Sequence, residues 1–182
     1  MKLVILDRDG VINEDSDAFV RSVDQWIPLP GSLQAIARLN AAGWRVVVAT
    51  NQSGIARGLY SVDTFHAMHN KMQALLAQLG GSVEGVFFCP HAPHHRCTCR
   101  KPRPGLFQEI AARLRVDLRG VPAVGDSLRD LQAAERVGAR PVLVRTGKGA
   151  ETERQAALPP GTEVFDDLQA FVERLLAPLP LC

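Results

Sequence analysis

Short apolar runs alternate along the chain with longer segments in which apolar residues recur every three or four positions. The short runs are rich in branched side chains and predict strands over residues 3–6, 45–49, 85–89, 122–124, 141–144 and, more weakly, 163–165. The longer segments predict helices over residues 31–42, 61–79, 105–114, 127–137 and 167–175. Strands that alternate with helices indicate βαβ units and therefore a parallel sheet with helices on both faces.

This pattern predicts an α/β fold: a three-layer, Rossmann-like, doubly wound parallel sheet. The chain of 182 residues contains no repeat, low-complexity tract or long linker, so we expect one domain over residues 1–182. In such sheets ligands bind at the carboxyl ends of the strands. The residues that follow each predicted strand are therefore the first place to look for chemistry.

Composition narrows the range of partners. Apolar residues make up 46% of the chain and charged residues 22%, the formal net charge is +2, and aromatic residues make up 5%. This near-neutral charge and the scarcity of aromatic residues argue against nucleic acid as a partner. The sequence shows no signal-peptide pattern and no apolar run of membrane-spanning length. We therefore expect a cytoplasmic monomer that acts on a small molecule without contacting a membrane.

Three acids follow two of the predicted strands. Asp7 and Asp9 come directly after the run at residues 3–6, and Asp126 follows the run at residues 122–124. Turn formation and helix capping are the ordinary explanation for such residues. Three carboxylates in one crevice repel one another, however, and a divalent cation relieves that repulsion. Oxygen ligands of this kind are typical of Mg²⁺ sites.

Two further polar segments suit an anion. Thr50, Asn51, Gln52 and Ser53 follow the second predicted strand and offer hydroxyl groups and backbone N–H groups, although they are also common helix-capping residues. Arg100 and Lys101 lie just before a predicted helix start, where a cation can meet a phosphate group. A solvated basic loop is the ordinary alternative for this pair.

Three of the four cysteines lie close together after the third predicted strand. Cys89, Cys97 and Cys99 share residues 89–99 with several histidines, and the fourth cysteine, Cys182, lies in the C-terminal tail. In a reducing compartment such a cluster indicates a metal before it indicates disulfides. Structural Zn²⁺ takes four thiolate or imidazole ligands. His91, His94 and His95 are all candidates for the fourth ligand.

These motifs together resemble the haloacid dehalogenase superfamily of aspartate-nucleophile phosphatases. DRDGV at 7–11 is similar to its first motif, Thr50-Asn51 to its second, Lys101 to its third and GDSLRD at 125–130 to its fourth. The chain has no insertion of the size of a large cap domain after Asp9 or before Lys101. The resemblance spans nearly the whole chain and implies phosphoryl transfer.

The resemblance also implies roles for individual residues. Asp7 would be the nucleophile, Asp9 the general acid and base, and Asp7, Asp9 (through its carbonyl) and Asp126 the magnesium ligands. Thr50, Asn51 and Lys101 would stabilise the phosphoryl oxygens. Asp130 would be either an acid behind these residues or a helix cap.

The segments CPH at 89–91, CTCRKPRPG at 97–105 and TNQSGIARG at 50–58 resemble one branch of this superfamily, the heptose bisphosphate phosphatases. That resemblance implies a sugar bisphosphate substrate with the phosphate removed from C7, and Cys89, His91, Cys97 and Cys99 as the ligands of a structural zinc. It also implies substrate contacts through seven residues: Asp15, Ser16, Asp17, Ala18, Gln52, Ser53 and Arg100. Some heptose relatives carry lysine where this chain has Ser127, so the resemblance assigns Ser127 no role.

Two alternatives remain at this stage. Histidinol-phosphate phosphatases share the DRDG motif, the cysteine cluster and the CxCRKP segment, but not LVRTGKG at residues 143–149. A receiver-like signalling domain would also place acids and a lysine at strand ends and accept a phosphoryl group on aspartate. An acid at Asp9, two residues after Asp7, and the cysteine cluster both argue against a receiver domain.

Overall fold

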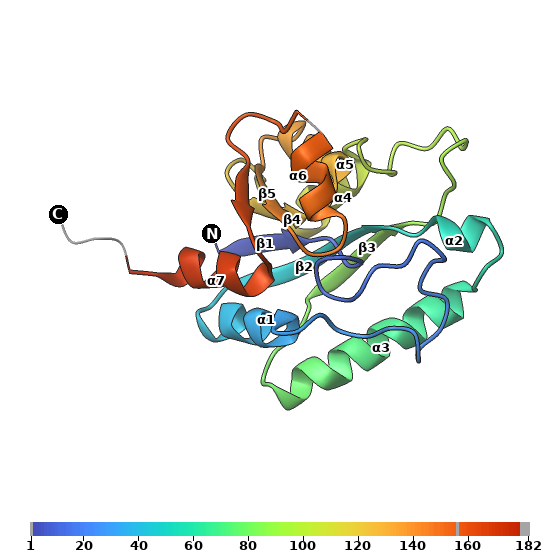
Figure 1. Ribbon diagram of the computed structural model, residues 1–182, viewed down its shortest axis with the longest axis horizontal. Helices are drawn as coiled ribbons and strands as arrows, with labels where there is room; N and C mark the ends of the chain where they lie inside the picture. The colour runs from blue at the N-terminus through green and yellow to red at the C-terminus, as the bar shows by residue number, and fades with distance from the viewer. Residues whose placement is uncertain (1, 156, 179–182) are drawn as a thin grey trace.

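The computed structural model describes residues 2–155 and 157–178, and a six-stranded parallel sheet runs through them (Figure 1). The four inner strands are mostly buried, as expected for strands covered on both faces, whereas the two edge strands are mostly half-buried. The strands are β1 (Leu3–Leu6), β2 (Arg45–Asn51), β3 (Gly85–Cys89), β4 (Pro122–Gly125), β5 (Arg140–Val144) and β6 (Glu163–Phe165).

The order of the strands places the first one in the middle of the sheet. The order is β3-β2-β1-β4-β5-β6, so the chain winds outward to one edge, returns, and winds outward to the other. The winding direction changes between β1 and β4, which pair in parallel through Ile5 with Ala123 and Leu6 with Val124. Such a switch point leaves a crevice at the carboxyl ends of its two strands.

Helices form the outer two layers of the three-layer fold. Helices α1 (Ser32–Ala41), α3 (Val62–Gln78) and α7 (Leu168–Leu176) lie on one face of the sheet, and α4 (Gly105–Leu114) and α5 (Leu128–Glu135) lie on the other (Figure 1). Alternate residues of β1 point to opposite faces, so Val4 and Leu6 join the first core and Leu3 and Ile5 the second. Burying both cores holds the strand ends in place.

Every predicted strand and helix is present, and the ends differ from the prediction by at most two residues. β2 continues to Asn51, and two short helices, α2 (Ser53–Ala56) and α6 (Gly149–Gln155), were not predicted. Both are too short to show a helical apolar repeat; α2 starts just after the polar end of β2, and α6 follows the loop after β5. Between β1 and α1 the chain forms turns and two isolated bridges but no helix, so no large cap covers the switch point.

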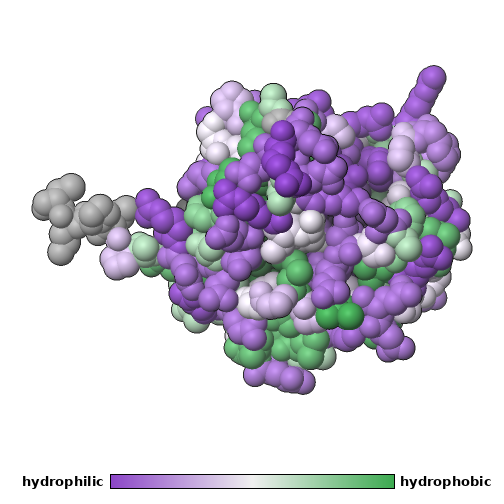
Figure 2. All heavy atoms as spheres, in the orientation of Figure 1, coloured by the Kyte–Doolittle hydropathy of each residue, from purple (hydrophilic) through white to green (hydrophobic). Residues whose placement is uncertain are grey.

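Hydrophilic residues cover most of the face seen in Figure 2, where apolar residues form small separate groups. None of the helices in the described residues has the length and apolar character needed to cross a membrane. Cys182 and the end of the predicted C-terminal tail lie outside the described residues.

Candidate active site

Three carboxylates meet at the switch point of the sheet. Asp7 follows β1, Asp126 follows β4, and Asp130 lies in the first turn of α5; one carboxylate oxygen of each lies within 4.8 Å of the others. All three side chains are buried. Asp7 and Asp126 are 119 positions apart in the sequence, so only the pairing of β1 with β4 brings them together.

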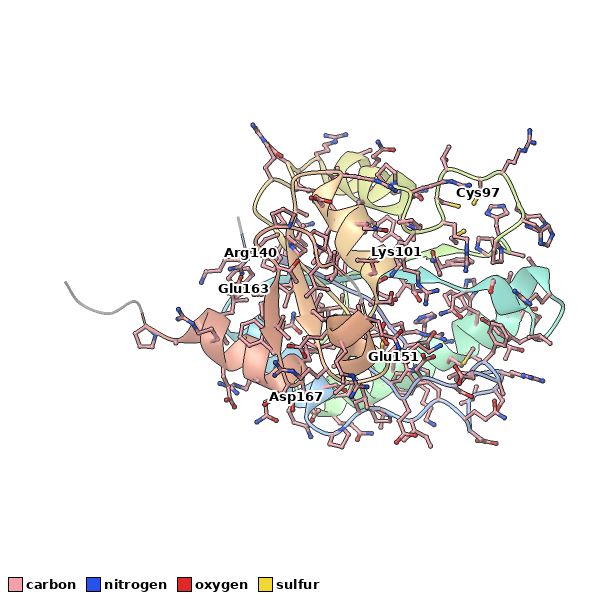
Figure 3. The ribbon with its side chains drawn as sticks, turned by 45° about the horizontal axis from the view of Figure 1, so that its top comes forward. Cys97, Lys101, Arg140, Glu151, Glu163 and Asp167 are labelled. Atoms are coloured by element: carbon pink, nitrogen blue, oxygen red, sulfur yellow. The ribbon has the colours of Figure 1, made fainter. Side chains whose placement is uncertain are left out.

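Lys101 supplies the cation of this acid group. Its Nζ lies 3.0 Å from Oδ1 of Asp7 and 2.8 Å from Oδ1 of Asp130, and it donates a hydrogen bond of 2.6 Å to the carbonyl of Ala49. The side chain of Asn51 holds the Lys101 backbone through two hydrogen bonds. Lys101 is therefore buried, and its side chain extends from the loop after β3 to the acid group (Figure 3).

Asp7 is oriented by two donors on the same oxygen. Its Oδ1 accepts a hydrogen bond of 2.7 Å from the backbone N–H of Arg8 and contacts Lys101. Burial raises the pKa of Asp7 to about 6 although Lys101 opposes the shift. Since Oδ1 is engaged in both contacts, Oδ2 is the oxygen available for chemistry.

Asp126 is held by the loop that follows β5. Its Oδ2 accepts a 2.9 Å hydrogen bond from the backbone N–H of Lys148. Two glycines make room for this carboxylate: a Cβ on Gly10 would lie 2.1 Å from Oδ2, and a Cβ on Gly147 2.3 Å from it. Both glycines have positive φ angles, 80° and 57°. Burial, together with Asp130 and Asp7, raises the pKa of Asp126 to about 8.

The acid group fits a magnesium ion. Three carboxylates face one ammonium group, and repulsion from Asp130 and Asp7 adds to burial in raising the pKa of Asp126. A hard divalent cation with oxygen ligands would remove this repulsion. The sequence assigned Asp7, the Asp9 carbonyl and Asp126 to magnesium, and the carboxylates of Asp7 and Asp126 lie in the acid group. The structure adds Asp130, which also pairs with Lys101 and forms the capping box of α5 with Ser127.

Asp9 lies outside the acid group, in a separate polar network. Its carboxylate accepts hydrogen bonds of 2.9 to 3.1 Å from the Arg8 guanidinium, 2.8 Å from Asn13 and 2.9 Å from Gln52. Burial raises the pKa of Asp9, but Arg8, Asn13 and Gln52 outweigh burial, so the pKa lies below its usual value. Asp9 is thus an ionised carboxylate in this conformation.

The segment after β2 belongs to the same network. The Gln52 amide donates to Asp9 and, at 2.9 Å, to Oγ1 of Thr50, and its carbonyl oxygen accepts from Tyr60. Thr50, Gln52 and Ser53 are all buried. The side chain of Gln52 therefore connects Thr50 to Asp9, and its polar atoms are already engaged.

The four predicted zinc ligands converge at the start of the loop after β3. Sγ of Cys89 lies 3.8 Å from Sγ of Cys97 and 3.2 Å from Sγ of Cys99, and Nδ1 of His91 lies 3.5 Å from Cys89 and 3.3 Å from Cys99. A tetrahedron with Zn–S bonds of 2.3 Å has edges of about 3.8 Å. The donor atoms therefore already have nearly the spacing that zinc requires.

The loop chemistry supports the same metal. Burial raises the pKa of Cys89 to about 12, so this thiol stays protonated unless a cation displaces the proton. The three cysteines of the loop are free of disulfides. His94 and His95 contact each other, and the donor group of the described residues contains only His91. Cys97 lies out on the loop and Lys101 nearer the sheet (Figure 3), so the ligands tie the loop down next to the acid group.

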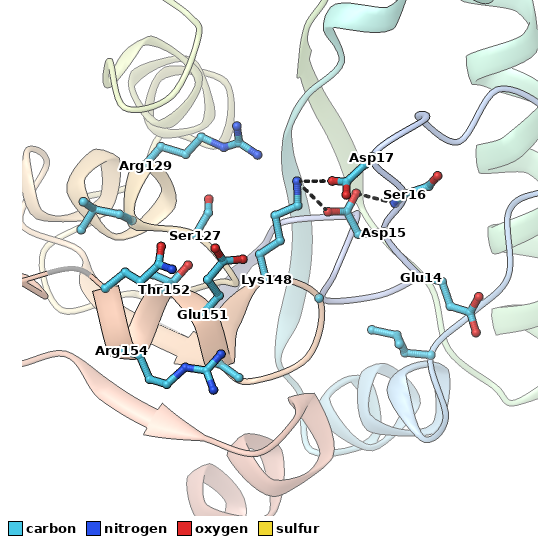
Figure 4. A pocket seen from close by; sticks show the side chains of 15 residues that line it. Glu14, Asp15, Ser16, Asp17, Ser127, Arg129, Lys148, Glu151, Thr152 and Arg154 are labelled. Atoms are coloured by element: carbon cyan, nitrogen blue, oxygen red, sulfur yellow. Dashed lines mark hydrogen bonds and ion pairs between the residues drawn. The ribbon is translucent and has the colours of Figure 1, made fainter.

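Three of the predicted substrate residues, at 15–17, border a cavity of about 1090 Å³ close to the acid group. Asp15, Ser16 and Asp17 line it together with Ser127, Arg129 and Lys148, whereas Ala18 lines an adjoining hollow. Nζ of Lys148 lies 2.9 Å from Asp17 and 3.8 Å from Asp15, which closes one side of the cavity (Figure 4). Arg100 donates to the carbonyl of His91 at 3.2 Å.

Two parts of this site were not predicted from the sequence. The loop after β5 supports Asp126 through Lys148 N–H and through Thr152, whose hydroxyl donates to the Asp126 carbonyl at 2.9 Å. The segment TGKG at 146–149 follows a predicted strand, so applying the strand-end argument to it would have found this loop. The fully buried Arg8, in contrast, looks like a solvated charge in the sequence.

Comparisons with known proteins agree with the motifs. A model described as HAD-hydrolase-like matches residues 98–171, and one described as polynucleotide kinase 3 phosphatase matches residues 2–131. A D-glycero-beta-D-manno-heptose-1,7-bisphosphate 7-phosphatase of Bordetella bronchiseptica is 62% identical and aligns over 97% of this chain and 98% of its own. The enzyme of that name from Pseudomonas putida is 54% identical over 97% and 100%.

Solved structures give the same result. The D,D-heptose 1,7-bisphosphate phosphatase of B. bronchiseptica, complexed with magnesium and phosphate, superposes with a TM-score of 0.95 over 97% of this chain and 98% of its own, at 62% identity. The enzyme from Burkholderia thailandensis has a TM-score of 0.78 over 98% and 100%, at 49% identity. The magnesium in the B. bronchiseptica structure agrees with the oxygen donors of the acid group, and the thiol and imidazole donors of the loop fit zinc. The chain belongs to the haloacid dehalogenase superfamily and, within it, to the D-glycero-beta-D-manno-heptose-1,7-bisphosphate 7-phosphatase family.

Proposed function

We propose that this protein hydrolyses the 7-phosphate of D-glycero-beta-D-manno-heptose 1,7-bisphosphate through an aspartyl-phosphate on Asp7. The observation that carries the proposal is the meeting of Asp7, Lys101 and Asp126 at the switch point, in a chain 62% identical to a phosphatase of that name. Histidinol phosphate, the other substrate considered from the sequence, is disfavoured because the similar enzymes above act on the heptose.

Asp7 attacks phosphorus through Oδ2. Its other oxygen is held by Lys101 and the Arg8 N–H, which orients the carboxylate. The O–P bond to Asp7 forms as the bond between phosphorus and the C7 oxygen breaks. Lys101, Thr50 and Asn51 stabilise the equatorial oxygens, where charge accumulates. Magnesium, held by Asp7, Asp126 and the Asp9 carbonyl, compensates the charge of the phosphate group when bound.

Asp9 completes both half-reactions. Because Asp9 is ionised in this conformation, it first takes up a proton from solvent, which it gives to the departing C7 alkoxide. It then takes a proton from the water that attacks phosphorus, which returns Asp7 as a free carboxylate, releases phosphate and leaves Asp9 protonated for the next cycle. To do so its carboxylate exchanges the Arg8, Asn13 and Gln52 contacts for the leaving group. Rotation of this side chain is therefore part of the proposed cycle.

Substrate specificity comes from the rim of the crevice, because no large cap covers it. Asp15, Ser16, Asp17 and Ala18 line the first wall, and Arg100 meets the phosphate that is not cleaved. Ser53 contributes at the start of α2, and Gln52 acts through Thr50 and Asp9. The proposal includes a monomer in the cytoplasm, where the three cysteines of the loop remain thiols.

A kinetic panel tests the proposal. With Mg²⁺ present, kcat/KM is compared for both anomers of heptose 1,7-bisphosphate, histidinol phosphate and fructose 1,6-bisphosphate. We expect the beta heptose bisphosphate to give the highest value. A preference of more than tenfold for histidinol phosphate would contradict the substrate assignment and leave the mechanism unaffected.

A further inference from the structure

Arg129 is a cation at the mouth of the active site that lies within the fourth motif but has no assigned role in that motif or in the mechanism above. It lies in the first turn of α5, three residues after Asp126, and lines the large cavity with Ser127, Asp15 and Lys148. In Figure 4 its guanidinium extends from α5 into the opening, in the direction of the Lys148 ammonium. It therefore faces the space that a substrate must enter to reach Asp7.

Within the described residues, this guanidinium forms neither a hydrogen bond nor an ion pair, whereas its neighbours are engaged. Lys101 is paired with Asp7 and Asp130, Lys148 with Asp17, and Arg100 with the His91 carbonyl. An unpaired arginine is often simply solvated. Here, however, Asp130, Asp7, Asp126 and Asp15 all attract it, and they outweigh the effect of partial desolvation on its pKa. These acids keep the guanidinium over the opening.

A second cation lies close by on the zinc loop. After burial, Arg129 is the strongest cause of the lowered pKa of Arg100, and Arg57 adds to it. This electrostatic effect of Arg129 on Arg100 means that the two guanidinium groups are close enough to repel. An anion bound between Arg100 and Arg129 would remove this repulsion. Both guanidinium groups can donate hydrogen bonds to the same phosphate.

Ser127, the neighbouring polar residue at the start of α5, cannot bind such an anion. Its hydroxyl donates to Oδ2 of Asp130 at 2.6 Å, and its backbone N–H donates to the same oxygen at 3.1 Å, which completes the capping box of α5. The polar atoms of Ser127 are thus committed to the helix start. On this turn of α5, only Arg129 presents a charge to the cavity.

We propose that Arg129 binds, together with Arg100, the C1 phosphate that is not cleaved, and that it is a specificity-determining residue for the bisphosphate. This inference rests on the proposed function. A heptose 7-phosphate carries the same scissile group without the second phosphate, so Arg129 contributes to binding only when the C1 phosphate is present. Its loss should therefore appear chiefly in KM for the bisphosphate.

The test measures kcat and KM of wild type, Arg129→Met and Arg129→Lys on heptose 1,7-bisphosphate and on heptose 7-phosphate. We expect Arg129→Met to lower kcat/KM for the bisphosphate about 10- to 100-fold, mainly through KM, and for the 7-phosphate about twofold or less. Arg129→Lys keeps the positive charge but not the paired N–H donors of the guanidinium group, so it should recover part of the lost kcat/KM. Arg113→Met is the control, because Arg113 is exposed on α4, where it pairs with Glu109.

Two outcomes would overturn the inference separately from the proposed function. If wild type prefers the bisphosphate and Arg129→Met keeps that preference, Arg129 does not bind the C1 phosphate. If both substrates lose activity equally, Arg129 acts on the scissile group or on the fold. A wild-type enzyme that does not hydrolyse the bisphosphate would instead contradict the proposed function, and this inference with it.

Discussion

The two candidate metal sites of this protein are built in opposite ways. All zinc ligands lie within residues 89–99, and after Cys89 their loop has no helix or strand. The acid group joins Asp7, Lys101 and Asp126, which come from three distant parts of the chain. The first depends on local spacing and on its metal; the second depends on strand order and on a packed sheet.

This difference has consequences for stability. Asp7 and Asp126 follow strands covered by core on both faces, so the site keeps its shape without an ion. The loop that carries Cys97 and Cys99 is half exposed. Its stability therefore depends on metal binding by its thiols and imidazole rather than on an apolar core. We therefore expect magnesium to control activity and zinc to control local folding. The predictions that follow test this division, beginning with the largest effect.

Asp7→Asn should lower kcat by about 10⁴-fold or more, because an amide cannot form the aspartyl-phosphate. The fold should remain, since the ion pair between Lys101 and Asp130 persists. Steady-state kinetics measures kcat, with deamidation of the variant excluded by mass spectrometry. Circular dichroism checks that the variant is folded. Appreciable turnover by the intact variant would contradict covalent catalysis.

Lys101→Met should lower the free energy of unfolding by about 3 to 5 kcal/mol, because it leaves two buried carboxylates without their cation. Denaturant unfolding in the absence of magnesium measures the loss. Adding Asp130→Asn to Lys101→Met should restore about 1 kcal/mol or more, since one buried charge is removed. A double variant no more stable than Lys101→Met would mean that the acid group does not depend on this cation.

Cys97→Ser should unfold the zinc loop and leave the sheet intact. Hydrogen exchange should rise over residues 89–100 and stay low in β1, β2 and β4, and kcat/KM should fall about 10- to 100-fold because Arg100 and Lys101 lose their support. Cys182→Ser is the matched control, as it removes a thiol outside the cluster. Unchanged exchange in the loop of Cys97→Ser would show that zinc is not needed for its structure.

The magnesium-free protein should lose stability as pH rises. Asp126, with a pKa of about 8, and Asp7, with a pKa of about 6, bind protons that the unfolded chain releases near pH 4, so stability falls between about pH 4 and pH 8. Mg²⁺ replaces these protons and should therefore stabilise more at pH 8 than at pH 5, by about 1 kcal/mol or more. Thermal unfolding with and without Mg²⁺ measures the difference. An Asp126→Asn variant should reduce it, and equal stabilisation at both pH values would contradict the assignment.

The sequence by itself determined the fold class and the three cysteines of the candidate zinc site, whereas the structure selects His91 among the three histidines. The alternation of branched runs and helical repeats is local, as is the spacing of Cys89, Cys97 and Cys99, because it depends only on neighbours in the chain. The short helices α2 and α6 escaped prediction since they have too few residues for a repeat. The same strand-end logic indicated Asp7 and Asp126 but not the distance between them.

Only the tertiary structure decided how the acid group is completed. Strand order brings Asp126 to Asp7, and the loop after β5 then supplies the Lys148 N–H and the space beside Gly147. Burial separates residues that look alike in the sequence: Arg8 is enclosed with Asp9, whereas Arg129 stays unpaired over the cavity. Local pattern specifies what a segment can form, and long-range packing sets which charges meet, because desolvation and Coulomb energy depend on distances that the chain order does not contain.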